Sequence, residues 1–457
     1  MKNLIKNNIY YCLVLLTLCS CKKLIDVKGA GETLVTSSIF ADSTTAHAAL
    51  NGMYSELYNR SGLSIYAYRS SLLPAESADE LIPVQNTFDD FYNNSLLATD
   101  NNIKDWWSNS YNIIYQANKI IEGANASESL SLSLKKQLTA ESKFIRAFCS
   151  FYLVNYFGSI PLLTTSDLQV INTAPASTTS QVYTQIIADL SEARDALPKD
   201  YSWSGGNRTR VNSFVASAML ARVYLYTGQW ALAEEEATKV INQTSLYDIV
   251  LNPNNVFLAN SKEAIWQFYT NAYRCTYFAL QLIPTGLAVP KYAVNSVLYN
   301  AFENGDTRKS NWINSLSVSG TFYTYPYKYK TNTKTNTEFE MVLRLAEQYL
   351  IRAEARTQQN NTDRAQDDLN VIRRRAGLLK TTASDKASLL LAIERERQVE
   401  LCFEWGHRWL DLKRTNRANT VIGAQKPTSW QSTDVLYPIP QSAISTNRSL
   451  VQNEGYK

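Results

Sequence analysis

Residues 217–241 read Ser-Ala-Met-Leu-Ala-Arg-Val-Tyr-Leu-Tyr-Thr-Gly-Gln-Trp-Ala-Leu-Ala-Glu-Glu-Glu-Ala-Thr-Lys-Val-Ile, and this stretch decides the fold. Apolar residues recur at helical spacing until Gly228 supplies a stop. A second helix follows directly and runs to Ile241, with Ala233 on its packing face. Small side chains let two helices approach closely, and the bulky ring of Trp230 fills the elbow between them. The stretch therefore predicts two helices that pack as a hairpin.

The residue pattern of this hairpin matches a tetratricopeptide unit, which has small residues, a turn glycine and an aromatic plug at set positions. Those positions are held here by Ala221, Tyr224, Gly228, Trp230 and Ala233. A second pair is expected at 341–358 and 362–376. There Ala353 and Ala365 repeat the 12-residue offset of Ala221 and Ala233. The chain thus predicts more than one unit of the same kind.

Further helix pairs are expected at 134–157 with 179–197, and at 39–59 with 105–124. Because the pairs are scattered rather than tandem, a regular solenoid is not predicted. Segments 59–104 and 244–340 are richer in Asn, Thr, Pro, Tyr and Gly, which indicates loops with short strands. The expected fold class is all-α dominated, with tetratricopeptide-like helix pairs forming a platform that carries large irregular loop insertions.

The N-terminus has the order of a secretory signal: Lys2 and Lys6, then about ten mostly apolar residues, then Leu18-Cys19-Ser20-Cys21. The apolar run is well short of the ~20 residues that span a bilayer. A small Ser before Cys, with Leu three residues before that Cys, resembles a bacterial lipobox. The resemblance implies that residues 1–20 are a signal peptide and that Cys21 carries a lipid anchor. The alternative is an ordinary secreted protein with an incidental cysteine in its signal.

Composition argues against several classes of protein. The 457 residues carry a net charge of only +4, which is too small to indicate a nucleic-acid partner. The cysteines outside the signal and anchor are Cys149, Cys275 and Cys402, an odd number without metal-ligand spacing. We therefore expect buried thiols rather than a disulfide framework or a zinc site. His47 and His407 lie far apart, so no metal site is predicted, and no cofactor motif is present.

A carboxylate pair for glycoside cleavage could be imagined in the helical run at 394–404, which contains Glu394, Glu396, Glu400 and Glu404. Arginines alternate with these residues, and cationic neighbours lower a carboxyl pKa, which is the opposite of what a general acid needs. We expect ion pairs on the surface or between helices instead, and no enzyme activity. Trp405, Trp409 and His407 are expected to pack the last helix onto the body.

Family motifs follow one another in order along the chain. Residues 141–163 run from a helix into Phe157-Gly158-Ser159-Ile160-Pro161. Further motifs lie at 182–190, 218–226, 344–355, 368–377, 394–404, 437–441 and 452–456. Together they resemble the SusD/RagB family, the outer-membrane nutrient-binding lipoproteins of Bacteroidetes, over nearly all of the chain after the signal. Trp405 stands where the family usually has Gly and Glu454 where it usually has Pro, which puts the local turn geometry in doubt.

The resemblance implies an N-terminal SusD-like region at 21–240 and a C-terminal SusD/RagB region at 241–457 in one compact body. It also implies an outer-membrane location with the protein exposed at the cell surface, although Lys22 and Lys23 leave the periplasmic face open. In the family the helical platform faces a SusC-like TonB-dependent transporter, and loops on the other side present the ligand. Neither a cofactor nor a catalytic residue is implied.

Candidate ligand-binding residues are aromatic and polar side chains of the two insertions. An aromatic plane can cover the apolar face of a pyranose ring, while Asp, Asn and Arg can bond its hydroxyls. The candidates are Tyr66, Tyr68, Arg69, Asp79 and Tyr92 in the first insertion, and Tyr273, Arg274 and Trp312 in the second. The second insertion also contains Tyr269 and Tyr277. Any of these tyrosines can equally be a packing residue, and of Trp106 and Trp107 at least one is expected in the core.

The resemblance and the composition of these loops together imply a protein that binds nutrient oligosaccharides and hands them to the transporter without changing a bond. A peptide cargo, as in RagB-type relatives, would suit the same aromatic and Asn-rich loops. A structural scaffold at the outer membrane is the alternative from another class, because tetratricopeptide-like concavities often bind protein segments.

Overall fold

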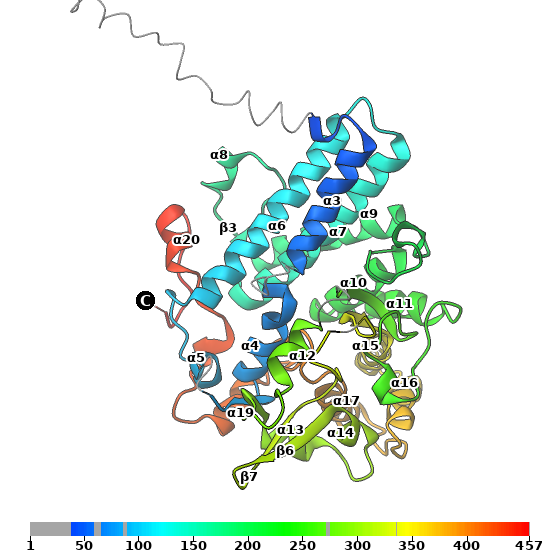
Figure 1. Ribbon diagram of the computed structural model, residues 1–457, viewed down its shortest axis with the longest axis vertical. Helices are drawn as coiled ribbons and strands as arrows, with labels where there is room; N and C mark the ends of the chain where they lie inside the picture. Colours follow the sequence, from blue (N-terminus) through cyan, green and yellow to red (C-terminus); the bar gives the residue numbers. More distant parts are fainter. Residues whose placement is uncertain (1–37, 59–64, 86–88, 271–274, 335, 457) are drawn as a thin grey trace, which may run out of the picture.

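The computed structural model describes residues 38–58, 65–85, 89–270, 275–334 and 336–456 (Figure 1). Its first helices are α3 (Ser43–Leu57), α4 (Ser70–Ser77), α5 (Asp89–Asn93), α6 (Asn101–Ala126), α7 (Leu132–Phe157), α8 (Leu168–Ile171), α9 (Thr179–Ala196), α10 (Ser213–Tyr226) and α11 (Trp230–Ile241). Those that follow are α12 (Tyr277–Leu282), α13 (Ser296–Ala301), α14 (Thr307–Trp312), α15 (Leu345–Gln358), α16 (Thr362–Arg375), α17 (Lys386–Glu400), α18 (His407–Arg414), α19 (Ala418–Gln425) and α20 (Gln441–Thr446). None of the helices within these ranges is long and apolar enough to cross a membrane.

The strands are short and pair two by two. They are β1 (Leu81–Pro83), β2 (Ile160–Pro161), β3 (Ala176–Ser177), β4 (Ala264–Phe268), β5 (Tyr292–Val294), β6 (Ile313–Val318), β7 (Thr321–Pro326) and β8 (Glu340–Arg344). The antiparallel pairs are β1 with β5, β2 with β3, β4 with β8, and β6 with β7. The expected helix-dominated fold class is confirmed.

The hairpin predicted from residues 217–241 is present as α10 and α11, which pack against each other. Ala221 and Ala233 are fully buried, as expected for small residues where two helices approach closely. Gly228 takes a φ of +70°, a left-handed conformation that glycine adopts without steric cost and that ends the first helix. The second predicted pair forms α15 and α16, again with both alanines, Ala353 and Ala365, buried.

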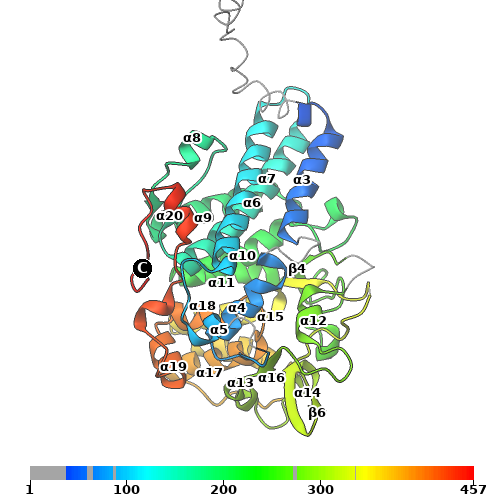
Figure 2. The ribbon, with the colours of Figure 1, turned by 60° about the vertical axis from the view of Figure 1, so that its left-hand side comes forward.

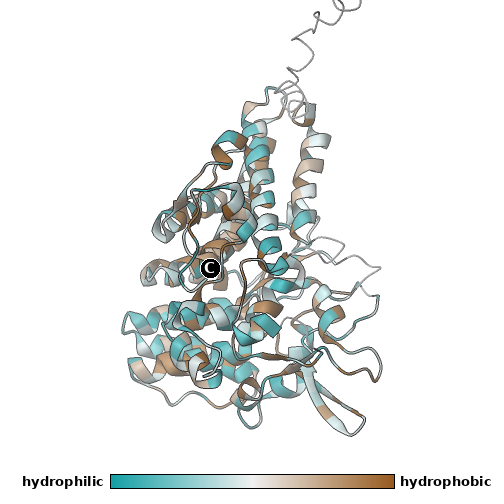
Figure 3. Cartoon of the chain, turned by 90° about the vertical axis from the view of Figure 1, so that its left-hand side faces the viewer, coloured by the Kyte–Doolittle hydropathy of each residue, from teal (hydrophilic) through white to brown (hydrophobic). Residues whose placement is uncertain are grey.

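Helices α3, α6, α7 and α9 form a long bundle at one end of the molecule (Figures 1 and 2). Asp100 and Ser131 start α6 and α7, because their side chains accept hydrogen bonds from otherwise unpaired backbone amides of the first turn. Helix α7 packs on both α6 and α9, and α3 packs on α6 and α7. The array continues from α9 to α10, α11, α15 and α16, so the scattered pairs form one platform. Hydrophobic and hydrophilic residues alternate along the bundle helices (Figure 3).

The two insertions contact each other through the β1–β5 pair, where Leu81 lies opposite Val294. The β6–β7 hairpin lies at the end of the molecule opposite to the start of α3 (Figures 1 and 2). Loops with short strands describe most of 244–340, but the described part of 59–104 is largely helical, with a π-helix at Ile65–Arg69 followed by α4, α5 and the start of α6. The prediction is wrong at residues 70–77, which form the helix α4 with every residue buried. Its sequence has no polar face and contains Pro74, so it lacks the periodic signal of a surface helix.

The core is rich in aromatic rings contributed by distant parts of the chain. Trp106 and Trp107 of α6 are both buried, in agreement with the expectation that at least one lies in the core. Trp405, Trp409 and His407 are buried as well, which confirms their expected packing role. The thiols Cys149, Cys275 and Cys402 are buried, as expected. Burial raises the pKa of Cys149 and Cys402 to about 12, so these two are unreactive at neutral pH.

The turn at Trp405 explains why glycine suits this position in the family. Trp405 has a φ of +49° and the following Gly406 a φ of +67°, so both are left-handed. The cost of placing a side chain there is offset by the buried indole, whose Nε1 donates to the Met341 carbonyl at 2.6 Å. The indole also stacks on the ring of Tyr66, with 6.4 Å between ring centroids. Glu454, the second unusual residue, is exposed in a turn.

Candidate ligand-binding site

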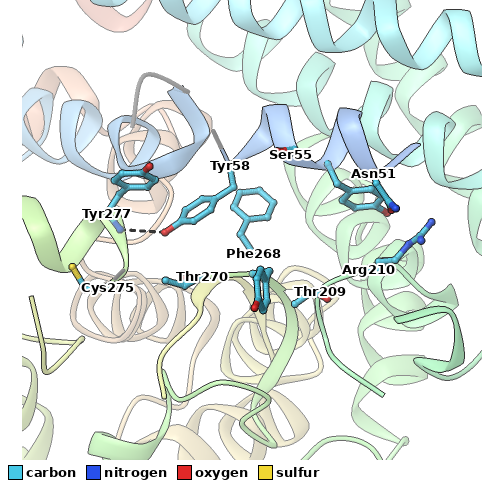
Figure 4. Close-up of a pocket in the computed structure, with 11 residues that line it drawn as sticks. Asn51, Ser55, Tyr58, Thr209, Arg210, Phe268, Thr270, Cys275 and Tyr277 are labelled. Atoms are coloured by element: carbon cyan, nitrogen blue, oxygen red, sulfur yellow. Dashed lines mark hydrogen bonds between the residues drawn. The ribbon is translucent and has the colours of Figure 1, made fainter. Parts of the chain in front are cut away.

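A pocket of about 320 Å³ opens where the end of α3, the end of β4 and the start of α12 meet (Figure 4). It is lined by Asn51, Tyr54, Ser55, Tyr58, Thr209, Arg210, Phe268, Tyr269, Thr270, Cys275 and Tyr277. The four residues from α3 and its cap recur at i, i+3, i+4 and i+7, which puts them on one face of the helix. Aromatic rings therefore share the pocket with amide, hydroxyl and guanidinium groups.

One wall of the pocket is fixed by a buried carboxylate, Glu141 of α7. Glu141 accepts hydrogen bonds from Arg210, at 2.9 Å from Nε and 2.7 Å from Nη2, and from the Tyr54 hydroxyl at 2.7 Å. The Arg210 guanidinium also lies over the Tyr54 ring, 5.5 Å from its centroid. Burial, together with the charge of Glu141, raises the pKa of Tyr54 well above its usual value, so the hydroxyl stays protonated. This wall is therefore rigid and carries a permanent cation.

The opposite wall is built on Tyr58, which caps α3. Its hydroxyl accepts a hydrogen bond from the backbone amide of Tyr277 at 3.1 Å and makes a long one to Glu340 at 3.5 Å. Its ring lies 5.5 Å from Phe268 and 5.2 Å from Tyr277, measured between centroids. Burial raises the pKa of Glu340 to about 8, so this carboxyl is protonated at neutral pH. The wall presents rings and hydroxyls without a net charge.

The mouth of the pocket holds an exposed aromatic ring. Tyr269 is 61% exposed and is supported by an edge contact to Phe339 at 5.2 Å between centroids. Asn51 and Ser55 of α3 are exposed nearby in the lining. A supported ring beside amide, hydroxyl and guanidinium groups suits a ligand with an apolar face and a rim of hydroxyls.

Three of the predicted binding residues are wrong as surface contacts, because the structure buries them. The Tyr66 hydroxyl shares a hydrogen bond of 2.7 Å with Ser110. Asp79 accepts bonds from Arg408 Nε and Nη2 at 2.8 and 2.7 Å, and the Trp312 indole donates to the Pro253 carbonyl at 3.0 Å. Tyr66 and Asp79 anchor the first insertion to α6 and α18, and Trp312 joins two parts of the second insertion. None of the three presents a face to a ligand.

The remaining candidates lie elsewhere or outside the described residues. Tyr68, Arg69 and Tyr92 are partly buried and do not line the pocket. Arg69 pairs with Asp105 at 3.0 Å, and Tyr92 lies beneath the Lys426 ammonium at 4.8 Å. Tyr273, Arg274 and the anchor Cys21 lie outside the described residues, so their roles stay predictions. Thr270 and Cys275, which flank residues 271–274, both line the pocket.

The sequence interpretation missed Tyr54, Tyr58 and Arg210. The i, i+3, i+4, i+7 run of Asn51, Tyr54, Ser55 and Tyr58 was an available signal, because it gives the predicted helix 39–59 a polar and aromatic face. Nothing local marks Arg210, whose role depends on Glu141 some 69 residues away.

The carboxylates of the 394–404 run are held in ion pairs between elements, as expected. Glu396 pairs with Arg308 at 2.6 Å, Glu394 with Arg408 at 3.2 Å, and Glu404 with Arg344 at 2.7 Å. Burial alone would raise the pKa of Glu400 and Glu404, but the surrounding arginines and Lys328 hold both values below the usual range. A general acid requires the opposite shift. Within the described ranges, His, Cys, Asp and Glu form no group of three or more that could hold a metal ion.

Comparison with known proteins identifies the family. The model of the SusD family matches residues 212–456, more than half of the chain, and a model described as "Starch-binding associating with outer membrane" matches residues 36–225. A SusD-like protein, P2, of Formosa agariphila is 29% identical over 99% of this chain and 100% of its own length. The starch-binding protein SusD of Bacteroides thetaiotaomicron is 35% identical over 25% of this chain and 21% of its own.

A solved structure described as a laminarin-binding SusD-like protein superimposes with a TM-score of 0.78. It is 26% identical and the match covers 91% of this chain and all of that one. The matching family models, the relative aligned along its whole length and the shared architecture all agree. The chain belongs to the SusD/RagB family and shares that family's association with the outer membrane.

Proposed function

We propose that this protein binds nutrient oligosaccharides in the pocket between α3, β4 and α12, and that it releases them unchanged. The observation that carries the proposal is the exposed ring of Tyr269, supported by Phe339 at the mouth of a pocket with a fixed guanidinium, Arg210. Stacking on such a ring fits a sugar face, and the polar lining fits its hydroxyls. Relatives described as starch-binding and laminarin-binding support the same ligand class.

The proposal also covers the membrane anchor of the protein and its transporter partner. A lipid on Cys21 would anchor regions 21–240 and 241–457 as one body at the cell surface, where a SusC-like TonB-dependent transporter receives the ligand. Cys21→Ala should abolish fatty-acid labelling and leave the signal attached. Pull-down from detergent-solubilised outer membranes should bring down a large β-barrel partner. Recovery of soluble proteins without such a barrel would favour a scaffold instead.

The ligand class is tested by titration calorimetry against a panel of oligosaccharides and peptides. Tyr269→Ala should weaken binding of the best oligosaccharide while leaving the melting temperature unchanged, because the ring is largely exposed. Tyr115→Ala, which removes a partly exposed ring from α6 outside the pocket, is the matched control. Binding of peptides but of no sugar would show that the ligand is a peptide, as in RagB-type relatives. Equal sugar affinity in the Tyr269 variant and the wild type would place the site elsewhere.

A further inference from the structure

A second cleft, of about 370 Å³, lies between the β6–β7 hairpin and the segment from α13 to α14. It is lined by Tyr299, Glu303, Asn304, Gly305, Asp306, Lys309, Ser310, Ile313, Asn314, Ser315, Phe322 and Thr324. It shares no lining residue with the pocket around Tyr58. The pleat of the hairpin places Phe322 and Thr324 on one face, and Ser315 lies opposite Thr324 in the register. One face of the hairpin therefore forms a wall of the cleft.

Two aromatic rings border this cleft from opposite elements. Phe322 on β7 is 68% exposed, and Tyr299 on α13 is 36% exposed. A phenylalanine exposed to this extent contributes little to the stability of the fold, whereas a ring at the edge of a cleft can cover the apolar face of a ligand. Amide and hydroxyl groups of Asn304, Asn314 and Ser310 complete the lining. The cleft thus has the ring-and-hydroxyl chemistry of a sugar site.

The two sites differ in charge: in the first pocket Glu141 neutralises Arg210, whereas this cleft holds a cation that pairs with no carboxylate of the described residues. The carboxylates of the lining are already neutralised: Asp306 by Arg308 at 2.8 Å, and Glu303 by Arg373 at 2.7 Å. The hydrogen bond from Arg373 lowers the pKa of Glu303, so this carboxyl is ionised at neutral pH and its negative charge is paired with Arg373. The ammonium of Lys309 lies 3.8 Å from the centroid of the Tyr299 ring. Among the described residues no carboxylate lies within ion-pair distance of Lys309, which makes it the unneutralised cation of the lining.

We propose that this cleft is a second carbohydrate site, selective for a sugar residue that carries a carboxylate or a sulfate group. Lys309, held in place by the Tyr299 ring, pairs with the anionic group, and Phe322 covers the apolar face of the same or the next sugar. The inference does not depend on what the pocket around Tyr58 binds, because the two sites share no residue.

Calorimetry at low salt with three tetrasaccharides tests the proposal: oligogalacturonate for a carboxylate, a carrageenan oligosaccharide for a sulfate, and maltotetraose as the neutral probe. At least one acidic probe should bind more tightly than maltotetraose, and high salt should weaken that binding. Lys309→Gln should lower the affinity for the acidic probe by about tenfold, as for a hydrogen bond to a charged group, and Lys309→Arg should retain most of it. Phe322→Ala should weaken binding of the same probe. The acidic probe that binds identifies the anionic group.

Lys119→Gln is the matched control, because Lys119 also lies over a tyrosine ring, at 5.6 Å from the centroid of Tyr115, but on α6. It should bind the acidic probe as the wild type does. The proposal is overturned if neither acidic probe binds the wild type, if maltotetraose binds equally well through Lys309, or if Lys309→Gln changes nothing. Loss of acidic binding in Tyr269→Ala but not in Lys309→Gln would assign the anion to the first pocket, leaving the proposed function intact.

Discussion

Arg222 of α10 and Glu347 of α15 face each other with two parallel hydrogen bonds of 2.7 Å, although they are 125 residues apart in the chain. Both side chains are fully buried, and Arg222 also donates to the Tyr152 hydroxyl at 3.1 Å. A guanidinium out of water needs its donors occupied, so these bonds fix the position of α10 against α15 and α7.

Removing one partner of this pair should be strongly destabilising. Glu347→Gln leaves the buried guanidinium without a counter-charge, and we expect a loss of about 3–5 kcal/mol in the free energy of unfolding. The double variant Arg222→Met with Glu347→Leu replaces both charges by apolar groups and should recover most of that loss. Urea denaturation of the single and double variants measures both. A single variant as stable as the wild type would contradict the buried pair.

The small residue at the α10–α11 hairpin gives a second test. Ala221→Leu adds volume to a fully buried position and should cost about 1–3 kcal/mol through overpacking. Ala231→Leu, an exposed position on α11, should change stability by no more than about 0.5 kcal/mol. Thermal melts of the two variants give the comparison, and equal melting temperatures would mean that the hairpin contact does not involve Ala221.

The left-handed Trp405 predicts an unusual order of stabilities. Trp405→Ala loses the buried indole, at about 3–5 kcal/mol, and keeps a side chain in the strained conformation. Trp405→Gly loses the same ring but relieves roughly 1–2 kcal/mol of that strain, so it should be the more stable of the two. Glycine usually destabilises relative to alanine, so the reversed order is diagnostic. Chemical denaturation of the two variants measures their relative stability. If Trp405→Ala is more stable than Trp405→Gly, residue 405 does not have a positive φ.

Glu340 should make stability depend on pH. Burial raises its pKa from 4.5 to about 8, so between these values the folded protein holds a proton that the unfolded chain has lost. Stability contributed by this group therefore falls as pH rises through that window. Glu340→Gln, which is neutral at every pH, should gain stability relative to the wild type between about pH 5 and pH 8. Urea midpoints at the two pH values measure this, and a constant difference between the proteins would refute the shifted pKa.

The helix pairs could be predicted because their determinants are local. The turn at Gly228 and the alanines at 221, 233, 353 and 365 are readable within one or two dozen residues, since a helix repeats its packing face every few residues. Helix α4 was not predicted, because it is buried on all sides and its sequence shows no such repeat.

The ligand-binding residues were harder to predict from the sequence. Whether a side chain in an irregular segment is exposed depends on residues far away in the chain. Tyr66 and Asp79 look like loop residues until Ser110, 44 residues away, and Arg408, 329 residues away, are seen to hold them in the core. Tyr269 differs from these two residues. The ring of Phe339 contacts it at an edge, and 61% of Tyr269 stays exposed. Composition alone does not separate an anchoring ring from a presented one.

Tyr437 lies near the end of the chain, yet it closes a core that begins early. Its backbone amide bonds to the Tyr156 carbonyl at 2.8 Å, and its ring stacks on Tyr156 at 5.2 Å between centroids and contacts Trp106 at 5.9 Å. During synthesis from the N-terminus, α6 and α7 therefore emerge long before the ring that covers them. The aromatic surface of α6 and α7 lacks this cover until the segment around Tyr437 has been made. Because exposed aromatic surface favours aggregation, we expect a chain truncated before Tyr437 to be less soluble than the complete one.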